Sequence, residues 1–282
     1  MPLDPSTVGY TTKPHAYTYD WRTLATYALG IGAKRDELDY LYENAKNGMK
    51  VYPTFAVVPA FPPVVEMLAR TGGDMAMVVH GGQTVHVHRA IPASGTLQTT
   101  GTIKAMYDLK KFGQVVVETN TTIDGAPLFD TVWSIIYRGH GSFGGPRPPA
   151  GDIGIDVPES REPDWNFEEA TSPEQALLYR ISGDTNPLHA DPEFAAMVGF
   201  PQGPILHGLA TYGFAGRALV RGSAGGDATR VRSFGAQFRK PVWPGEVIET
   251  KGWNLEGGKV AMLAYVKGRP EPVLTSTWAI LG

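Results

Sequence analysis

The pattern of hydrophobic and polar positions in the second half of the chain predicts two helices followed by four strands. Residues 204–220 form a long apolar stretch rich in Gly and Ala, and residues 175–182 form a shorter helical stretch before it. Alternating segments bounded by turn residues then predict strands near 230–240, 246–254, 259–267 and 273–280. Small side chains let the long helix approach other backbone closely. We therefore expect an α+β unit in which a curved antiparallel sheet wraps one central helix.

A proline-rich segment divides the chain. Residues 143–164 contain five of the 23 prolines and four glycines, which is typical of an extended connection. On its N-terminal side, helical material is again followed by strand-like segments. We expect an N-terminal unit at 1–145, a linker at 146–165 and a C-terminal unit at 166–282.

Two residue spacings recur on both sides of this linker. The paired residues stand six positions apart, at Arg89 and Gly95, Pro127 and Trp133, Arg239 and Gly245, and Pro272 and Trp278. The offsets between the copies are 150 and 145 residues. Their agreement indicates a duplicated unit of roughly 130 residues.

Charge and composition narrow the classes of function. The 25 basic and 28 acidic residues leave a formal charge of −3, without the basic runs that mark nucleic-acid or membrane surfaces. The absence of cysteine excludes disulfides and thiolate metal sites. The first residues do not resemble a signal peptide, and no apolar stretch approaches ~18 residues. We expect no nucleic-acid or membrane partner and a cytoplasmic location.

Three polar residues that suit proton transfer lie within six positions, at Asp184, Asn186 and His189. A carboxylate and an imidazole that converge on one small volume can move protons. Simpler interpretations exist, because Asp184 and Asn186 can form a turn and Asp191 before a proline is a typical helix start. Asp, Asn and His can also bind metals. The calcium-loop pattern nevertheless fails, because His189 stands where that loop requires glycine.

A second signal precedes the long helix, where His207 is followed by Gly208. The unpaired N–H groups and the positive dipole end of a helix N-terminus favour an anion. Glycine there leaves room for a ligand oxygen to reach the backbone, or it serves only close packing of helix and sheet. Together with the cluster at 184–189, this helix start could supply an acid–base pair and a backbone donor.

The segment 179–208 also carries a family motif. The runs YRISGDTNPLH (179–189), DP (191–192) and PILHG (204–208) resemble the hydratase 2 motif of MaoC-like (R)-specific enoyl-CoA hydratases. These runs resemble in particular those of the hydratase domain of peroxisomal multifunctional enzyme type 2. The likeness extends to FRKPVWPG (238–245), VHGGQ (79–83) and GSFGG (141–145), and so covers nearly the whole chain. The resemblance implies a double hotdog fold with a degenerate first unit and a catalytic second unit.

The resemblance further implies reversible syn hydration of a trans-2-enoyl-CoA to a (3R)-3-hydroxyacyl-CoA. Asp184 and His189 would be the acid–base pair, Asn186 would hold the water or the pair, and Gly208 would donate its N–H to the thioester oxygen. The matching substrate-binding positions are His80, Gly81, Lys110 and Phe238. It implies no metal and no cofactor, because CoA is part of the substrate. The first unit would line an acyl tunnel.

Other possibilities stay open. Between Phe200 and Pro204 the chain has one residue more than the family pattern, which leaves the reach from His189 to Gly208 uncertain. The same fold could dehydrate 3-hydroxyacyl thioesters on acyl carrier protein, or serve as a non-catalytic acyl-thioester binding module. From the family likeness we expect a homodimer.

Overall fold

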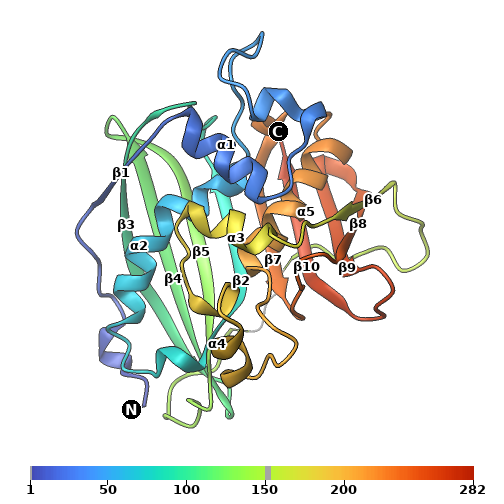
Figure 1. Cartoon of the computed structure of the whole chain (residues 1–282). Helices are drawn as coiled ribbons and strands as arrows, with labels where there is room; N and C mark the ends of the chain where they lie inside the picture. The colour runs from blue at the N-terminus through green and yellow to red at the C-terminus, as the bar shows by residue number, and fades with distance from the viewer. Residues whose placement is uncertain (1, 150–153) are drawn as a thin grey trace.

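One antiparallel sheet runs through the whole molecule. The computed structural model describes residues 2–149 and 154–282, and within them ten strands pair in the order β1-β3-β4-β5-β2-β7-β10-β9-β8-β6 (Figure 1). The strands of the first half are β1 (His15–Tyr19), β2 (Val78–Val87), β3 (Gly95–Asp108), β4 (Phe112–Ile123) and β5 (Ala126–Arg138). Those of the second half are β6 (Trp165–Ala170), β7 (Val231–Phe238), β8 (Val247–Asn254), β9 (Lys259–Val266) and β10 (Pro272–Leu281).

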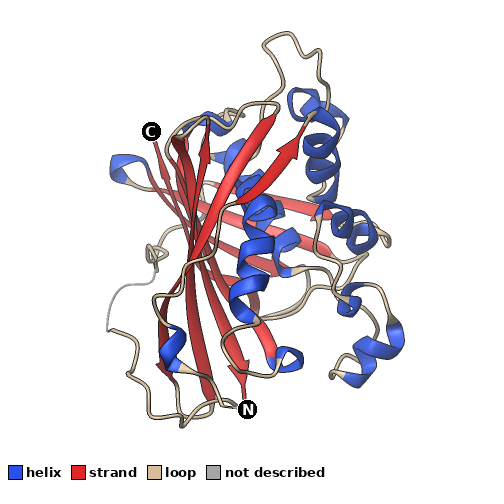
Figure 2. Cartoon of the chain, turned by 90° about the vertical axis from the view of Figure 1, so that its left-hand side faces the viewer, coloured by secondary structure: helices blue, strands red, loops and turns tan. Residues whose placement is uncertain are grey.

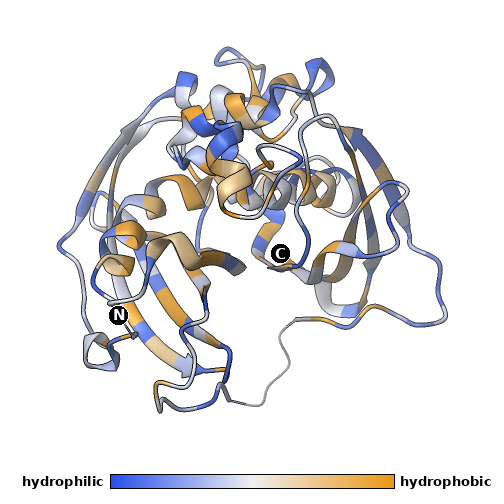
Figure 3. Cartoon of the chain, turned by 60° about the horizontal axis from the view of Figure 1, so that its bottom comes forward, coloured by the Kyte–Doolittle hydropathy of each residue, from blue (hydrophilic) through white to orange (hydrophobic). Residues whose placement is uncertain are grey.

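The α-helices gather on one side of this sheet (Figure 2). Seen from below, the sheet curves around them (Figure 3). The helices are α1 (Trp21–Gly30), α2 (Val57–Leu68), α3 (Gln175–Tyr179), α4 (Pro192–Met197) and α5 (Gly208–Gly222). Twelve of the fifteen residues of α5 are buried, so this helix lies in the core as the pattern predicts. No helix among the described residues is long and apolar enough to cross a membrane.

The two halves have the same strand order. Read from the outer edge to the centre, β1-β3-β4-β5-β2 corresponds to β6-β8-β9-β10-β7, and α2 corresponds to α5. The starts of these two helices are 151 residues apart, close to the offsets of the sequence repeat. All four predicted strands of the second half are present. The linker predicted at 146–165 lies partly outside the described residues, at 150–153, and its last residue begins β6.

The predicted long helix begins later than expected. The prediction started it at Pro204, but α5 starts at Gly208. The preceding segment is extended, because the Leu206 N–H donates to the carbonyl of Val242 in the β7–β8 loop at 2.7 Å and His207 has φ −56° and ψ 135°. A contact with a distant loop therefore overrides the local helical pattern.

Glycines let α5 pack closely against both halves. A Cβ at Gly213 would lie 2.2 Å from Cγ2 of Ile31, and one at Gly222 would lie 2.4 Å from the ring of Trp165. Such distances are far below van der Waals contact, so a larger side chain would force the backbone apart. The small residues of α5 therefore serve the close approach that the sequence suggests.

A buried ion-pair network joins the halves around Arg217 of α5. The Arg217 guanidinium is fully buried and donates from Nε to both carboxylate oxygens of Glu37 at 2.9 Å. It also pairs with Glu169 of β6, which accepts a further bond from Arg221 at 2.8 Å. Buried charges are tolerated only when they are paired in this way. The network ties the segment between α1 and α2 to the second half.

Candidate active site

A series of short caps folds the segment between α3 and α5. Asp184 Oδ1 accepts the N–H of Asn186 at 3.1 Å, and Asn186 Oδ1 accepts the N–H of Leu188 at 3.0 Å. Asp191 caps α4 by accepting the N–H groups of Glu193 and Phe194. The simple turn and cap interpretations are thus correct for Asn186 and Asp191. For Asp184 the turn occupies one carboxylate oxygen and leaves the other for chemistry.

His189 is buried and its tautomer is set by a hydrogen bond. Its Nδ1 lies 2.8 Å from the carbonyl oxygen of Ile205, so Nδ1 carries the proton and Nε2 keeps a free lone pair. Burial lowers the pKa of His189 below its usual value, while the charge of Asp184 and the Ile205 carbonyl oppose this shift. The imidazole is therefore neutral near pH 7 and able to accept a proton.

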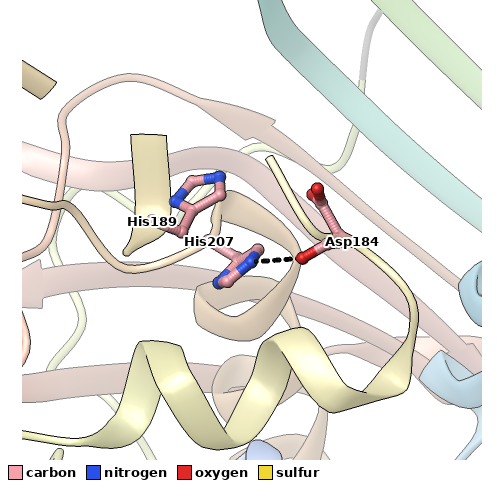
Figure 4. A group of neighbouring side chains, drawn as sticks. All are labelled: Asp184, His189 and His207. Atoms are coloured by element: carbon pink, nitrogen blue, oxygen red, sulfur yellow. Dashed lines mark hydrogen bonds between the residues drawn. The ribbon is translucent and has the colours of Figure 1, made fainter. Parts of the chain in front are cut away.

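His207 lies directly beneath this imidazole (Figure 4). The two rings stack with centroids 3.7 Å apart and an interplanar angle of 26°. The His207 Nε2 lies 3.0 Å from the backbone carbonyl oxygen of Asp184 and donates to it. Burial, with the nearby His189 and Arg180, lowers the pKa of His207 to about 2. His207 is therefore a neutral residue that contacts both members of the predicted pair.

The cluster formed by Asp184, His189 and His207 contains possible metal ligands, with one atom from each within 4.8 Å of the others. A shared ion would have to lie near the plane of both imidazoles, at ~2.1 Å from each nitrogen. Rings stacked 3.7 Å apart at 26° converge only far beyond that distance. The arrangement suits proton transfer better than metal binding.

A second cluster lies at the start of α5. A Cβ at Gly208 would lie 3.3 Å from the ring of Phe238, so even an alanine side chain would press against this ring. The Phe238 ring centroid is 4.7 Å from that of His80, which stacks on Trp133 at 5.0 Å. Surrounding protein atoms lower the pKa of His80 to about 4, and its Nε2 donates to the carbonyl of Gly82 at 3.0 Å. Residues of β2 and β7 thus meet beside the first turn of α5.

The other predicted substrate-binding residues differ in their placement. Gly81 follows His80 in β2, and a Cβ there would lie 2.7 Å from Cγ1 of Ile136, so a larger residue would disturb the strand pair. Lys110 is exposed in the β3–β4 turn at φ 66°, where its N–H donates to Asp108. Gly81 thus adjoins His80 in the chain but faces Ile136 and Ser134, and Lys110 lies on the exposed surface of the turn.

A pocket of about 550 Å³ opens beside His189. Its walls come from α3, from the loop at 202–204 and from the β7–β8 and β9–β10 loops, through Leu177, Gln202, Trp243 and Arg269. The loop is held in place, since Trp243 Nε1 donates to the Gly203 carbonyl at 3.2 Å. The loop therefore lies beside the pocket, and the rings of His189 and His207 remain in contact.

Comparisons with known proteins agree with these features. Residues 17–139 match the family model of the MFE-2 hydratase 2 N-terminal domain, and residues 157–271 match that of the MaoC like domain. The 3-hydroxyacyl-thioester dehydratase Y of Mycobacterium tuberculosis is 39% identical over 95% of this chain and 93% of its own. Enoyl-CoA hydratase 2, peroxisomal, of Arabidopsis thaliana is 36% identical over 94% and 91%. The chain belongs to the MaoC-like hydratase 2 family.

Solved structures confirm the fold of this hydratase 2 chain. A MaoC-like dehydratase from Phytophthora capsici superimposes with a TM-score of 0.87 at 32% identity, covering 99% of this chain and 98% of its own. A Mycobacterium tuberculosis protein described as a double hotdog superimposes with a TM-score of 0.59 at 14% identity, covering 98% and 96%. The predicted α+β double hotdog is therefore confirmed.

Sequence reasoning missed part of the site. His207 was considered only as the residue before the helix, although a histidine inside the apolar run PILHGL is an available signal of a buried polar role. Trp243 and Arg269 were also missed. They reach the pocket from loops more than 50 residues along the chain from His189, so no local spacing points to them.

Proposed function

We propose that this protein is a hydro-lyase that adds water reversibly to trans-2-enoyl-CoA to give (3R)-3-hydroxyacyl-CoA. The observation that carries the proposal is the convergence of the Asp184 carboxylate and the His189 imidazole beside the N-terminus of α5. Membership of the hydratase 2 family supports it, as does the Arabidopsis relative that bears the name enoyl-CoA hydratase 2.

The chemistry follows from the protonation states. Water held between Asp184 and His189 loses a proton to Nε2 of His189 while its oxygen bonds to C3 of the enoyl group. The electrons of the double bond move to the thioester oxygen, which the N–H of Gly208 stabilises. The pair then delivers a proton to C2, and the sum of the steps is addition of one water molecule. Delivery from the side of water attack gives syn addition.

The second cluster suits the substrate rather than the reaction. Phe238 packs next to Gly208, His80 packs against Phe238, and both residues lie on strands that meet at the junction of the two halves. A neutral His80 can contact the thioester end without adding charge. We assign the acyl chain to the first half, beyond these rings, because the core residues of that half are apolar.

Dehydration is the main alternative. The Mycobacterium relative is named a 3-hydroxyacyl-thioester dehydratase, and hydration and dehydration are opposite directions of one reaction. The same residues catalyse both directions by microscopic reversibility. Rates on one acyl chain attached either to CoA or to acyl carrier protein distinguish the carriers. A non-catalytic binding module is disfavoured, because binding alone does not require a carboxylate beside a buried imidazole.

Loss of the enoyl-thioester absorbance tests the proposal directly. Purified protein should consume crotonyl-CoA or decenoyl-CoA, and Asp184→Asn and His189→Ala should each lower kcat by at least ~100-fold. Asp191→Asn is the matched control, because asparagine caps a helix as well as aspartate does. Unchanged absorbance with several chain lengths would contradict the hydratase proposal. Wild-type rates in both site variants would contradict the assignment of the pair.

The remaining expectations stay predictions with simple tests. A homodimer should give twice the 30.4 kDa chain mass in solution, and the exposed apolar side chains Leu177, Ile181 and Met197 support a covered surface near α3 and α4. Activity should survive dialysis against a chelator if no metal or cofactor takes part. Cell fractionation tests the cytoplasmic location, since one relative is named peroxisomal.

A further inference from the structure

His207 is the residue that touches every part of the proposed reaction centre. It is fully buried and forms the N-cap of α5, directly before Gly208. Its ring stacks on His189 at 3.7 Å, and its Nε2 donates to the Asp184 carbonyl at 3.0 Å. Its own carbonyl accepts the N–H groups of Ala210 and Thr211 in the first turn of α5.

The surroundings of His207 keep its ring neutral and fixed. Tyr179 packs on it with ring centroids 4.9 Å apart, and Arg180 and His189 both disfavour a positive charge on it. Because Nε2 carries the proton, the ring can donate to the Asp184 carbonyl at any pH at which the protein is folded. A fixed donor is suited to holding backbone in place.

We propose that His207 is a positioning residue that aligns Asp184, His189 and the N–H of Gly208 as one unit. This inference rests on the proposed hydratase function. The stack sets the plane of the His189 ring, and so the direction of its Nε2 lone pair. The hydrogen bond sets the turn that carries the Asp184 carboxylate, and the peptide link to Gly208 places the oxyanion donor in the same frame.

The neutral ring has a second effect on His189. During turnover His189 becomes an imidazolium that lies against the face of His207. A charged residue at that position would raise the energy of this state, whereas a neutral ring excludes water without adding repulsion. Asp184 faces His189 from the turn, and Glu246 and Arg269 line the pocket beside it.

Two substitutions separate the functions of the ring and of the donor. His207→Gln keeps an N–H at the position of Nε2 but loses the stacked ring, whereas His207→Phe keeps a ring and loses the donor. We expect each to lower kcat about 10-fold, and His207→Ala about 100-fold, with KM for decenoyl-CoA changed less than about threefold. A group that held only the substrate would change KM instead.

The pH profile distinguishes positioning from loss of stability. Removing the ring exposes His189 and moves its pKa up toward the usual value, so the acidic limb of kcat/KM should shift to higher pH in His207→Gln but not in His207→Phe. Gly213→Ala is the control, because it strains the same helix against Ile31 without touching the site. Its kcat and pH profile should match those of the wild type at temperatures at which it stays folded.

The outcomes identify which idea fails. Wild-type hydratase activity together with unchanged kcat and pH profiles in both His207→Gln and His207→Phe would overturn the positioning role and leave the hydratase function standing. A wild type inactive on every chain length would overturn the function and, with it, this inference. Equal changes in Gly213→Ala would show that the effect is one of helix stability and would also overturn it.

Discussion

The N–H of Gly208 can be removed with little change to the helix that carries it. Gly208 is the first residue of α5, so its N–H has no partner within the helix. Proline is favoured at this position, and the φ −56° and ψ 135° of His207 suit a residue before proline. Gly208→Pro should therefore delete the proposed oxyanion donor while α5 still forms.

The expected magnitude follows from comparing two substitutions at this position. Proline and alanine both add a Cβ about 3.3 Å from the Phe238 ring, which must shift slightly in either variant. Only proline removes the donor, and loss of one such donor costs about 3 kcal/mol, or ~100- to 1000-fold in kcat. We expect Gly208→Ala to lose less than about tenfold, so the ratio of the two variants isolates the N–H.

The assay is kcat for hydration of decenoyl-CoA, measured with circular dichroism to confirm that the helices are intact. Binding of the saturated decanoyl-CoA, which develops no enolate charge, reports the steric effect of the proline ring. The reasoning is refuted if Gly208→Pro keeps more than about a third of the kcat of Gly208→Ala, because a lost oxyanion donor cannot have so small an effect.

Three further predictions concern stability. Arg217→Met leaves the largely buried Glu37 without a counter-charge and Glu169 with only Arg221, so it should cost ~3–5 kcal/mol and lower Tm by about 6–10 °C. The partly exposed Arg221→Met should cost ~1 kcal/mol or less, and equal losses would contradict the network. Gly213→Ala overpacks against Ile31 and should cost ~1–3 kcal/mol in urea denaturation, and no loss would contradict the close contact. The folded-state pKa of His207, about 2, is below its unfolded value, so only the unfolded chain gains this proton as pH falls below about 6.5. Unfolding free energy should then fall by ~2 kcal/mol between pH 6.5 and 5 from this residue, and His207→Phe should lack this part.

The regular elements could be predicted because their signals are local. The strands of the second half alternate over part of their length between buried and less buried positions, with runs of three buried residues in β7 and β9, and glycine or proline bounds most of them, so the sequence pattern locates them. The start of α5 could not be predicted in this way. The pairing of Leu206 with Val242 depends on a loop 36 residues away, which no window around the helix contains.

The site, too, contains contacts that local sequence predicts and contacts that depend on the fold. Asp184 and His189 lie five residues apart, and the side chains that cap the turn between them belong to the same short segment, so they could be predicted from the sequence. The contact of His207 with the Asp184 carbonyl spans 23 residues and depends on where α5 packs. For Lys110 the fold gives only an exposed position on the β3–β4 turn, so its substrate-binding role stays a prediction from the family likeness.

The junction of the two halves has the form of a symmetric dimer contact within one chain. With an offset of 151 residues, Gly82 corresponds to Ser233 and His86 to Gln237, so the pairing of Gly82 with Gln237 maps onto that of His86 with Ser233. Such self-complementary pairing is the mark of a two-fold interface. Because the halves are covalently joined, this contact does not depend on protein concentration. One half can therefore lose its reaction centre by mutation without any loss of assembly, a freedom that two identical subunits do not have.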